Sequence, residues 1–204
     1  MAKPSVHIRP AVFPDDKQDV ARLFLAYAQS LPISLDFQNF EDELAALPGK
    51  YAADKGGAVW LAYASPGESE PDSSTSTSLD GGAKANAGQT TDDQAIGCIA
   101  VRPFFATPTT AESAALLASS TSPTTASCEL KRLYLTPESR GLGVAKVLMD
   151  VAVAHARALG YKEMLLDTLR TMTPARRLYE RYGFEETGSY YHNPEDAVFY
   201  RLAL

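Results

Sequence analysis

The sequence contains few of the residues that could cross-link it or hold a metal ion. Its 204 residues include two cysteines, Cys98 and Cys128, and three histidines, and none of these has the spacing of metal ligands. Both cysteines lie on or beside predicted strands, far apart in the sequence. We expect them to be small buried side chains, with a disulfide or an acyl-cysteine intermediate as the alternatives. No metal site is predicted.

Long apolar runs and an excess of basic residues are also missing. No apolar run approaches the roughly 20 residues of a membrane span, and the first five residues lack the apolar core of a signal peptide. The 19 Lys and Arg residues against 25 Asp and Glu residues give a net charge of -6, whereas a nucleic-acid backbone needs a basic face. The sequence therefore predicts a cytoplasmic protein with no membrane and no nucleic acid among its partners.

Large apolar residues are almost absent from residues 65–93, which are dense in Ser, Thr, Gly, Asp and Glu. Such a segment buries too little surface to offset its ordering entropy, so we expect a flexible surface insertion between two neighbouring strands. A second insertion, at about residues 104–127, includes residues 111–117, whose pattern is compatible with one short helix. With 45% apolar residues overall, the chain is expected to form a single domain over residues 1–204.

The most informative stretch reads as a strand, a tight turn and a helix. Residues 130–135 are rich in branched and aromatic side chains and end before Pro137, which has no N–H to donate to a sheet. From Val144 onward, apolar residues recur at the i, i+3, i+4, i+7 spacing of one helix face, which predicts a helix. Gly160 stands where the C′ residue that ends such a helix is expected. The predicted buried stripe consists of positions 144, 147, 148, 151, 152, 155, 158 and 159, all apolar except His155.

The turn itself contains two glycines, Gly141 and Gly143. Because glycine has no Cβ, backbone N–H groups can closely approach a ligand here, at the positively polarised end of a helix. Such a place binds an anion, most often a phosphate, although glycines before helices are often only turn residues. A dinucleotide-binding unit is disfavoured because Lys146 stands where its third glycine should be.

Three short segments in this half of the chain have a recognisable form. Residues 133–137 read Leu-Tyr-Leu-Thr-Pro, residues 140–145 read Arg-Gly-Leu-Gly-Val-Ala, and residues 175–184 read Ala-Arg-Arg-Leu-Tyr-Glu-Arg-Tyr-Gly-Phe. They match the strand end apolar-x-apolar-x-Pro, the pyrophosphate loop Arg/Gln-x-x-Gly-x-Gly/Ala and the later motif Ala-x-x-Leu-Tyr-x-x-x-Gly-Phe. Outside its two insertions, the chain thus resembles the Gcn5-related N-acetyltransferase (GNAT) superfamily.

The resemblance implies an α/β (α+β) fold with the order β-α-α-β-β-β-α-β-α-β-β. Its central sheet is mixed and mostly antiparallel, is splayed between the fourth and fifth strands, and has helices on both faces. The pattern of the remaining sequence agrees, and it includes a short helix from about Phe40 to Leu47 with Asn39 as its N-cap. The other predicted elements are strands at residues 6–10, 58–63, 95–102, 163–168, 184–189 and 197–202, and helices opening at Asp15-Asp16 and at Thr173 or Pro174.

Acetyl-CoA is the cosubstrate that the resemblance implies. Backbone groups of Leu133 and Leu135 would pair with the amides of its pantetheine arm, and loop N–H groups with the Arg140 guanidinium would hold its pyrophosphate. A structural salt bridge is the alternative role for Arg140. Many family members have an asparagine where this chain has Met172, so that amide contact is missing. The expected cofactor-binding residues are Leu133, Tyr134, Leu135, Arg140, Gly141, Leu142, Gly143, Val144, Ala145 and Lys146.

Acetyl transfer to an amine needs an uncharged nucleophile and relief of charge on the departing thiolate. The resemblance implies that Glu129 is the base, often acting through water, and strand alternation predicts that it shares a face with Leu133 and Leu135. A solvated or Lys131-paired carboxylate is the alternative. Tyr179 matches the family tyrosine whose hydroxyl points at the thioester sulfur, and a buried helix tyrosine is the alternative reading.

The resemblance also implies that the two early helices and the loop between them overhang the acceptor pocket, and that residues after the Gly-Phe signature often line it. Tyr51 is a further candidate there, and His192 could replace Glu129 as the base because its pKa is ordinarily near neutral. Ordinary helix core is the alternative for the aromatic residues, and a surface position is the alternative for His192. The expected acceptor residues are Tyr27, Phe37, Gln38, Tyr190, Tyr191, His192 and Asn193.

The leading hypothesis is an acetyl-CoA-dependent N-acetyltransferase that acts on a primary amine of a small molecule in a ternary complex. One alternative is a module that binds acyl-CoA without turnover, and another is a transferase acting on a protein or peptide amine. The acidity of the chain mildly favours a cationic acceptor. A monomer or a homodimer is expected.

Overall fold

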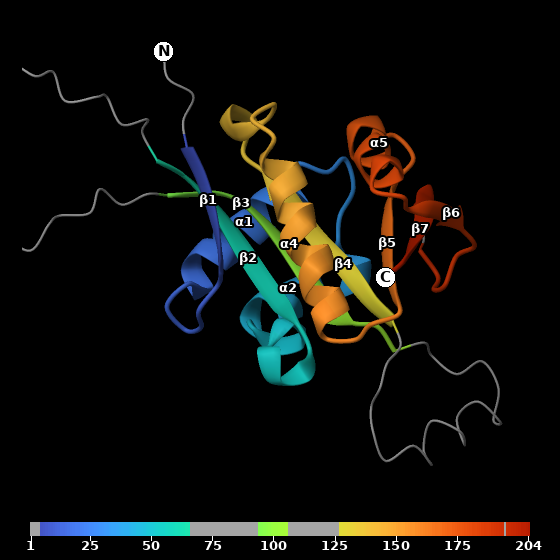
Figure 1. Cartoon of the computed structure of the whole chain (residues 1–204), viewed down its shortest axis with the longest axis horizontal. Helices are drawn as coiled ribbons and strands as arrows, with labels where there is room; N and C mark the ends of the chain where they lie inside the picture. The colour runs from blue at the N-terminus through green and yellow to red at the C-terminus, as the bar shows by residue number, and fades with distance from the viewer. Residues whose placement is uncertain (1–4, 66–93, 106–126, 194) are drawn as a thin grey trace, which may run out of the picture.

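The computed structural model describes residues 5–65, 94–105, 127–193 and 195–204. Its centre is a seven-stranded sheet with the order β1-β2-β3-β4-β5-β7-β6 (Figure 1). All neighbouring strands are antiparallel except β4 and β5, which run parallel. The strands are β1 (Ser5–Pro10), β2 (Ala58–Ser65), β3 (Ala95–Pro103), β4 (Ser127–Leu135), β5 (Glu163–Leu169), β6 (Glu185–Thr187) and β7 (Ala197–Ala203).

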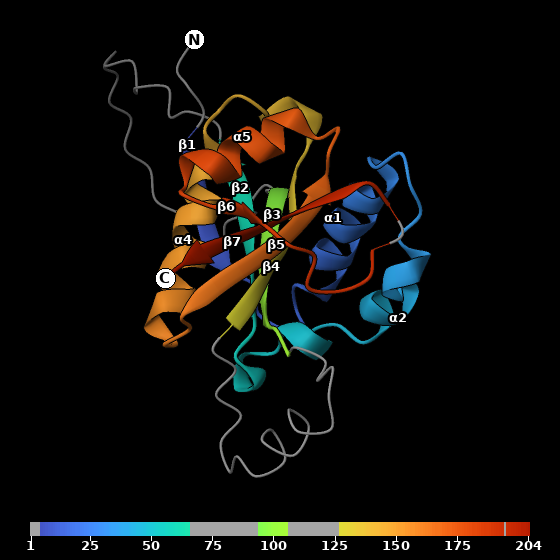
Figure 2. The ribbon, with the colours of Figure 1, turned by 90° about the vertical axis from the view of Figure 1, so that its right-hand side faces the viewer.

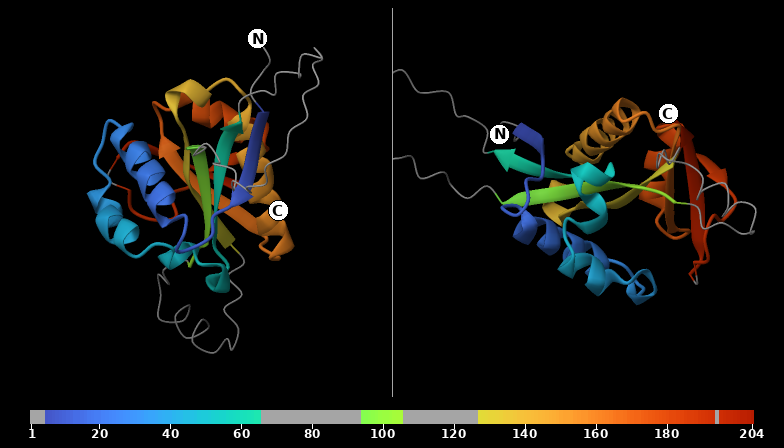
Figure 3. Two further views of the ribbon diagram at one scale, coloured as in Figure 1. Left: turned by 90° about the vertical axis from the view of Figure 1, so that its left-hand side faces the viewer. Right: turned by 90° about the horizontal axis from the view of Figure 1, so that it is seen from below.

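Helices cover both faces of this sheet. Figure 3 shows α4 on one face and α1 with α2 on the opposite face, and Figure 2 shows α5 at one end of β5. The predicted order of strands and helices is confirmed across the described residues. The helices are α1 (Lys17–Gln29), α2 (Phe40–Ala45), α4 (Val144–Ala158) and α5 (Thr173–Arg181), with short 3-10 turns η1 (Asp36–Gln38), η2 (Gly49–Tyr51), η3 (Ala53–Lys55) and η4 (Pro137–Ser139).

The first predicted insertion connects β2 to β3, which are antiparallel neighbours, as the sequence indicated. The helix expected at residues 111–117 lies outside the described residues. No helix in the described part of the chain is both long and apolar enough to cross a membrane.

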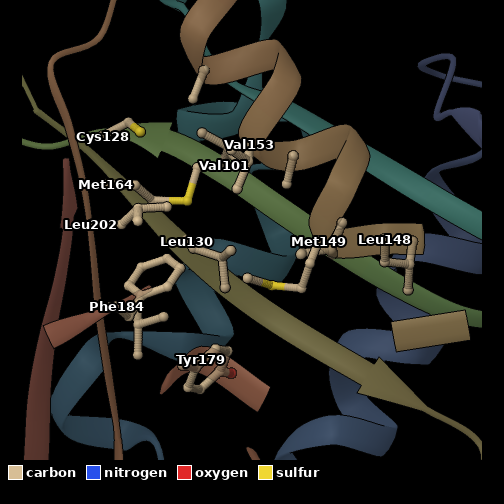
Figure 4. Packing of buried hydrophobic residues seen from close by; sticks show 14 of the residues in the cluster. Val101, Cys128, Leu130, Leu148, Met149, Val153, Met164, Tyr179, Phe184 and Leu202 are labelled. Atoms are coloured by element: carbon tan, nitrogen blue, oxygen red, sulfur yellow. The ribbon is translucent and has the colours of Figure 1, made fainter. Parts of the chain in front are cut away.

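Two apolar cores lie on opposite faces of the sheet. The core under α4 joins Leu148, Met149 and Val153 to strand residues such as Leu130 and Met164 (Figure 4). The core under α1 and α2 includes Val20, Leu23 and Phe24 with Leu61 and Cys98. Burial of aliphatic and aromatic side chains on both faces of the sheet stabilises a three-layer fold in which the sheet is the middle layer.

The buried face of α4 differs from the predicted stripe. Val144, Leu148 and Ala152 are buried as expected, but Val147 and Leu159 are 46% and 49% exposed. Their place in the core is taken by residues one position further round the helix, namely Met149, Val153 and Ala156. Both rows are apolar, so spacing alone did not distinguish the row that faces the sheet.

Asn39 is the N-cap of α2, as predicted, but it does not cap the helix through its side chain. It precedes α2 in the left-handed region, with φ 54°, and its side chain makes no capping hydrogen bond. Asparagine is one of the few residues that adopts this conformation readily, so the residue type is explained by backbone geometry instead.

Candidate active site

The parallel ladder between β4 and β5 is short. It pairs Ser127, Cys128 and Glu129 with Glu163, Met164 and Leu165. Later residues of both strands line one cavity of about 450 Å³, here called the central cavity, which includes Leu130 to Leu135 from β4 and Asp167 to Leu169 from β5. A volume of this size is typical of small-molecule sites.

A bulge in β4 determines which side chains reach this region. Arg132 has φ 58°, and the register with β3 shifts between Cys98 and Ala100. Because a bulge inserts one extra residue, the alternation of faces changes at this point.

Before the bulge, Cys128 and Leu130 pack in the α4 core, so Glu129 faces the α1 and α2 side. After it, Leu133 and Leu135 pack against the α4 core. The prediction that Glu129 shares a face with Leu133 and Leu135 is therefore wrong, because it assumed a strand without a bulge.

The glycine turn has open space on its outer side. Gly141 and Gly143 have φ 81° and 82°, and a Cβ built on either would meet nothing within 4 Å. The first hydrogen bond of α4 runs from the Lys146 N–H to the Gly143 carbonyl, 3.1 Å away. The N–H groups before it have no acceptor within the helix and can bind an anion. These residues fit a pyrophosphate group.

The central cavity brings together residues that are far apart in the sequence. Tyr27 comes from α1, Phe37 and Gln38 from η1, Arg140 from the glycine turn, and Tyr179 from α5. The sequence-predicted residues that line it are Tyr27, Phe37, Gln38, Leu133, Tyr134, Leu135, Arg140, Ala145, Tyr179 and Asn193.

A second cavity of about 260 Å³, here called the side cavity, has Glu129 in its wall. It shares Phe37, Gln38 and Lys131 with the central cavity. Two predicted acceptor residues, Tyr191 and His192, line the side cavity rather than the central one.

Several predicted residues line neither of these cavities within the described chain. Gly141, Leu142, Gly143, Val144 and Lys146 belong to the turn and the start of α4, and Val144 is buried in the core below it.

Two of the predicted aromatic residues are also placed elsewhere. The Tyr190 ring packs against Phe104 at 5.0 Å and against Phe199 at 5.0 Å. Tyr51 is 2% exposed in the α1 and α2 core, where its hydroxyl donates to Glu43 Oε1 at 3.0 Å. Tyr51 instead borders a larger cavity of about 1300 Å³, whose lining includes none of the predicted catalytic or cofactor residues.

Glu129 is fully buried and held by a guanidinium. Its Oε2 accepts hydrogen bonds from Arg102 Nε at 2.8 Å and Nη2 at 2.6 Å. Its Oε1 lies 3.6 Å from Lys131 Nζ and has no hydrogen-bond partner among the described residues. Glu129 is thus neither solvated nor paired with Lys131 alone. A buried unpaired carboxylate oxygen is costly unless a water or a ligand donates to it.

Lys131 links Glu129 to an acidic residue of the neighbouring strand. Lys131 Nζ donates to Asp167 Oδ1 at 3.0 Å, and Asn193 Nδ2 donates to Asp167 Oδ2 at 3.1 Å. Burial lowers the pKa of Lys131, but the nearby Asp167 and Glu129 carboxylates outweigh it and raise that pKa overall. Burial likewise opposes ionisation of Asp167, yet Lys131 holds the pKa of this carboxyl below its usual value. Both groups are therefore charged.

Arg102 and Asp167 were not predicted as site residues from the sequence. Asp167 follows three apolar residues of a predicted strand, and Arg102 ends another one. A charged residue within a strand buried on both faces needs a partner, and this was the available signal.

Tyr179 is 7% exposed and lies in the wall of the central cavity. Its ring packs 5.9 Å from Phe184, which Figure 4 shows beside it, and 6.3 Å from Tyr200. Burial raises the pKa of Tyr179 above its usual value. The hydroxyl therefore stays protonated and is able to donate a hydrogen bond into the cavity.

Residues 60–184 match the model of the acetyltransferase (GNAT) family. An uncharacterized N-acetyltransferase of Schizosaccharomyces pombe is 34% identical over 206 residues, covering 100% of this chain and 99% of the relative. Another, from Dictyostelium discoideum, is 28% identical over 198 residues, covering 89% of this chain and 92% of the relative. The chain therefore belongs to the GNAT family. It is an N-acetyltransferase.

Solved structures have the same fold at low sequence identity. A GNAT acetyltransferase from Staphylococcus aureus superposes with a TM-score of 0.63 at 16% identity, over 98% of this chain and 99% of the other. An acetyltransferase from Streptococcus agalactiae gives 0.62 at 16% identity, over 98% of both chains. The open mixed sheet with helices on both faces is thus the fold of this family.

Proposed function

We propose that this N-acetyltransferase moves an acetyl group from acetyl-CoA to a primary amine of a small molecule, by direct attack while both are bound. The observation that carries the proposal is the central cavity, because one space is lined by Arg140 and Ala145 on either side of the glycine turn, by the edge of β4, by Tyr179 and by the segment between α1 and α2. Its volume of about 450 Å³ suits a small acceptor together with the end of a pantetheine arm.

The residues of the turn would hold the cofactor. The free N–H groups at the start of α4 and the Arg140 guanidinium are donors for a pyrophosphate. The backbone groups of Leu133 and Leu135 at the β4 edge would pair with the pantetheine amides as another strand would. When bound, acetyl-CoA supplies a thioester whose acetyl group is transferred and whose thiolate leaves.

The amine must lose its proton before it attacks. An alkylamine with a pKa near 10.4 is neutral about once in 10³ at pH 7, which costs roughly 4–5 kcal/mol, whereas an α-amine near 7.8 costs about 1 kcal/mol. Glu129 is our proposed base, acting through a water in the side cavity. Arg102 occupies its Oε2, and its Oε1 is the oxygen left to accept a proton.

Tyr179 would stabilise the departing thiolate. A phenol with a pKa near 10 is a weaker acid than a thiol near 8.5, so full proton transfer would run uphill by about 2 kcal/mol. Burial raises the pKa of Tyr179 further, so its proton stays on the phenol oxygen. The hydroxyl therefore acts as a hydrogen-bond donor to the sulfur.

Two matched glycines test the cofactor site. Gly143 and Gly160 lie at opposite ends of α4, with φ 82° and 81°, and both have open space where a Cβ would stand. Alanine at either position costs about 1–2 kcal/mol of backbone strain. We expect Gly143→Ala to weaken coenzyme A binding in calorimetry by at least tenfold, and Gly160→Ala to leave it within twofold.

Turnover is tested with acetyl-CoA and a panel of primary amines, with the products identified by mass spectrometry. We expect acetylated small amines. Binding of coenzyme A without any product would favour the non-catalytic module, and acetylation of peptides alone would favour a protein acceptor. Equal loss of coenzyme A affinity in both glycine variants would contradict the proposed pyrophosphate site.

A further inference from the structure

The carboxylates in or just behind the walls of the two cavities are paired inside the protein. Asp167 pairs with Lys131 at 3.0 Å, and Glu129 pairs with Arg102 at 2.6 Å. Arg132, which lines the central cavity, pairs with Glu43 behind it at 2.8 Å. The three carboxylates have side chains 9%, 0% and 3% exposed, in the order Asp167, Glu129, Glu43.

This pairing leaves no acidic side chain uncompensated among the described residues that line either cavity. Lys131 Nζ lies between the two candidates, 3.0 Å from Asp167 and 3.6 Å from Glu129. A cationic group of a ligand that approached either carboxylate would therefore come close to this ammonium.

The magnitude of that repulsion decides whether a cationic group of a ligand can bind there. Two like charges about 5 Å apart repel by roughly 3 kcal/mol at an effective dielectric constant of about 20, which is comparable to the attraction of the carboxylate. A second ammonium would then gain little to offset its loss of hydration.

The walls of the central cavity on the acceptor side are mostly apolar. Tyr27 comes from α1, and the connection from α1 to α2 contributes Leu31, Ile33, Leu35 and Phe37. Burying an apolar group against such walls contributes about 25 cal/mol per Å².

We propose that the acceptor is a monoamine whose remaining part is apolar or uncharged, and that Lys131 excludes amines with a second cationic group. The inference rests on the proposed function and refines its substrate. It replaces the expectation of a cationic acceptor drawn from the acidity of the whole chain, since the surface charge is not the charge of the pocket.

The wild-type protein tests this with two acceptors that share a six-carbon chain, hexylamine and 1,6-diaminohexane, each assayed with acetyl-CoA. We expect kcat/KM for hexylamine to exceed that for the diamine at least tenfold. An equal or higher value for the diamine would overturn the inference and leave the acetyltransferase function standing. If neither of these nor any other amine is acetylated, the proposed function itself fails.

A charge-removing variant tests the role of Lys131. Lys131→Met removes the cation that pairs with Asp167 and leaves only the Arg102 pair of Glu129. We therefore expect the ratio of kcat/KM for hexylamine to kcat/KM for the diamine to fall at least tenfold. Arg170→Gln is the matched control because it removes one positive charge from an exposed pair with Asp196 outside both cavities, and its ratio should stay at the wild-type value.

The double variant Lys131→Met/Asp167→Asn restores the balance of charge and should return the preference for hexylamine. An unchanged ratio in Lys131→Met would show that Lys131 does not exclude cations. If this single variant does not fold, the wild-type ratio of hexylamine to diamine alone decides whether a second cationic group is excluded.

Discussion

The Tyr179 hydroxyl can be removed without disturbing the packing of its ring, which lies against Phe184 and Tyr200. We expect Tyr179→Phe to lower kcat by about 10- to 100-fold, because a hydrogen bond to a charged group is worth roughly 1.5–3 kcal/mol. The KM for acetyl-CoA should change less than twofold. Steady-state kinetics with saturating amine measures both values.

Tyr200→Phe is the control for that experiment. It also removes one phenol hydroxyl, which bonds Arg176 and Glu180 on α5 and does not line the central cavity. Its kcat should match the wild-type value. An unchanged kcat in Tyr179→Phe would mean that the thiolate leaves without help from this residue.

Glu129 offers a prediction that depends on the acceptor. If it removes the proton through water, Glu129→Gln should lower kcat for an alkylamine about 100-fold at neutral pH and change the acid side of the pH-rate profile. The loss should be much smaller for an amine with a pKa near 7.8, because that amine is already partly neutral. Equal losses for both amines, or an unchanged profile, would assign proton removal to another group.

The ion pair of Arg132 and Glu43 ties the bulge of β4 to α2. Arg132 Nε donates to Glu43 Oε1 at 2.8 Å, and the guanidinium lies 5.0 Å from the centre of the Phe40 ring. Burial opposes ionisation of Glu43, but the hydrogen bond from Arg132 lowers the pKa of this carboxyl overall. The pair therefore stabilises the fold above the usual carboxyl pKa of about 4, and this stability is lost as the pH falls below it.

Removing one partner of the Arg132–Glu43 pair should destabilise the protein more than replacing both partners by apolar residues. Arg132→Met leaves the Glu43 charge buried and alone, so we expect the free energy of unfolding in urea at pH 7 to fall by about 3–5 kcal/mol. In Arg132→Met/Glu43→Leu both charges are gone, and most of that loss should be regained. A double variant as unstable as the single one would mean that packing of the side-chain stem, not charge, is what Arg132 supplies.

Local pattern predicted the elements but not the faces they bury. The strand before Pro137 and the helix after Gly143 follow from turn residues and apolar spacing that the sequence displays directly. The bulge was not visible, because Arg132 takes a positive φ and its partner Glu43 is 89 residues away. For the same reason, the sequence alone could not predict on which side of the sheet Glu129 lies.

At the scale of the whole molecule, the site joins residues from most of the chain. The glycine turn and Tyr179 could be proposed from the sequence because each lies in a short motif with its own local pattern. Arg102, Lys131 and Asp167 come together only when β3, β4 and β5 lie side by side, and no spacing in the sequence encodes that contact. Motifs predict the reaction class, and the assembled sheet determines the charge of the proposed acceptor pocket.

The reactivity of the two cysteine thiols can show whether the strands of that sheet stay closed. Both are free and fully buried, on adjacent strands, which confirms the prediction of small core side chains. Cys98 Sγ lies 3.3 Å from the Arg132 carbonyl at the bulge. Burial raises the pKa of each thiol to about 12.

A thiol reagent that attacks the thiolate should therefore distinguish the folded protein from the unfolded one. At pH 8, a thiol with a pKa of about 12 is ionised only about once in 10⁴, whereas an ordinary cysteine near 8.5 is about a quarter ionised. We expect Ellman's reagent to react at least 10³-fold more slowly with the native protein than with the protein in 6 M guanidinium, where both thiols should react. Cys98→Ala and Cys128→Ala assign each rate. A native thiol that reacts as fast as a free peptide would show that its strand opens readily, since burial is the only protection the fold gives it.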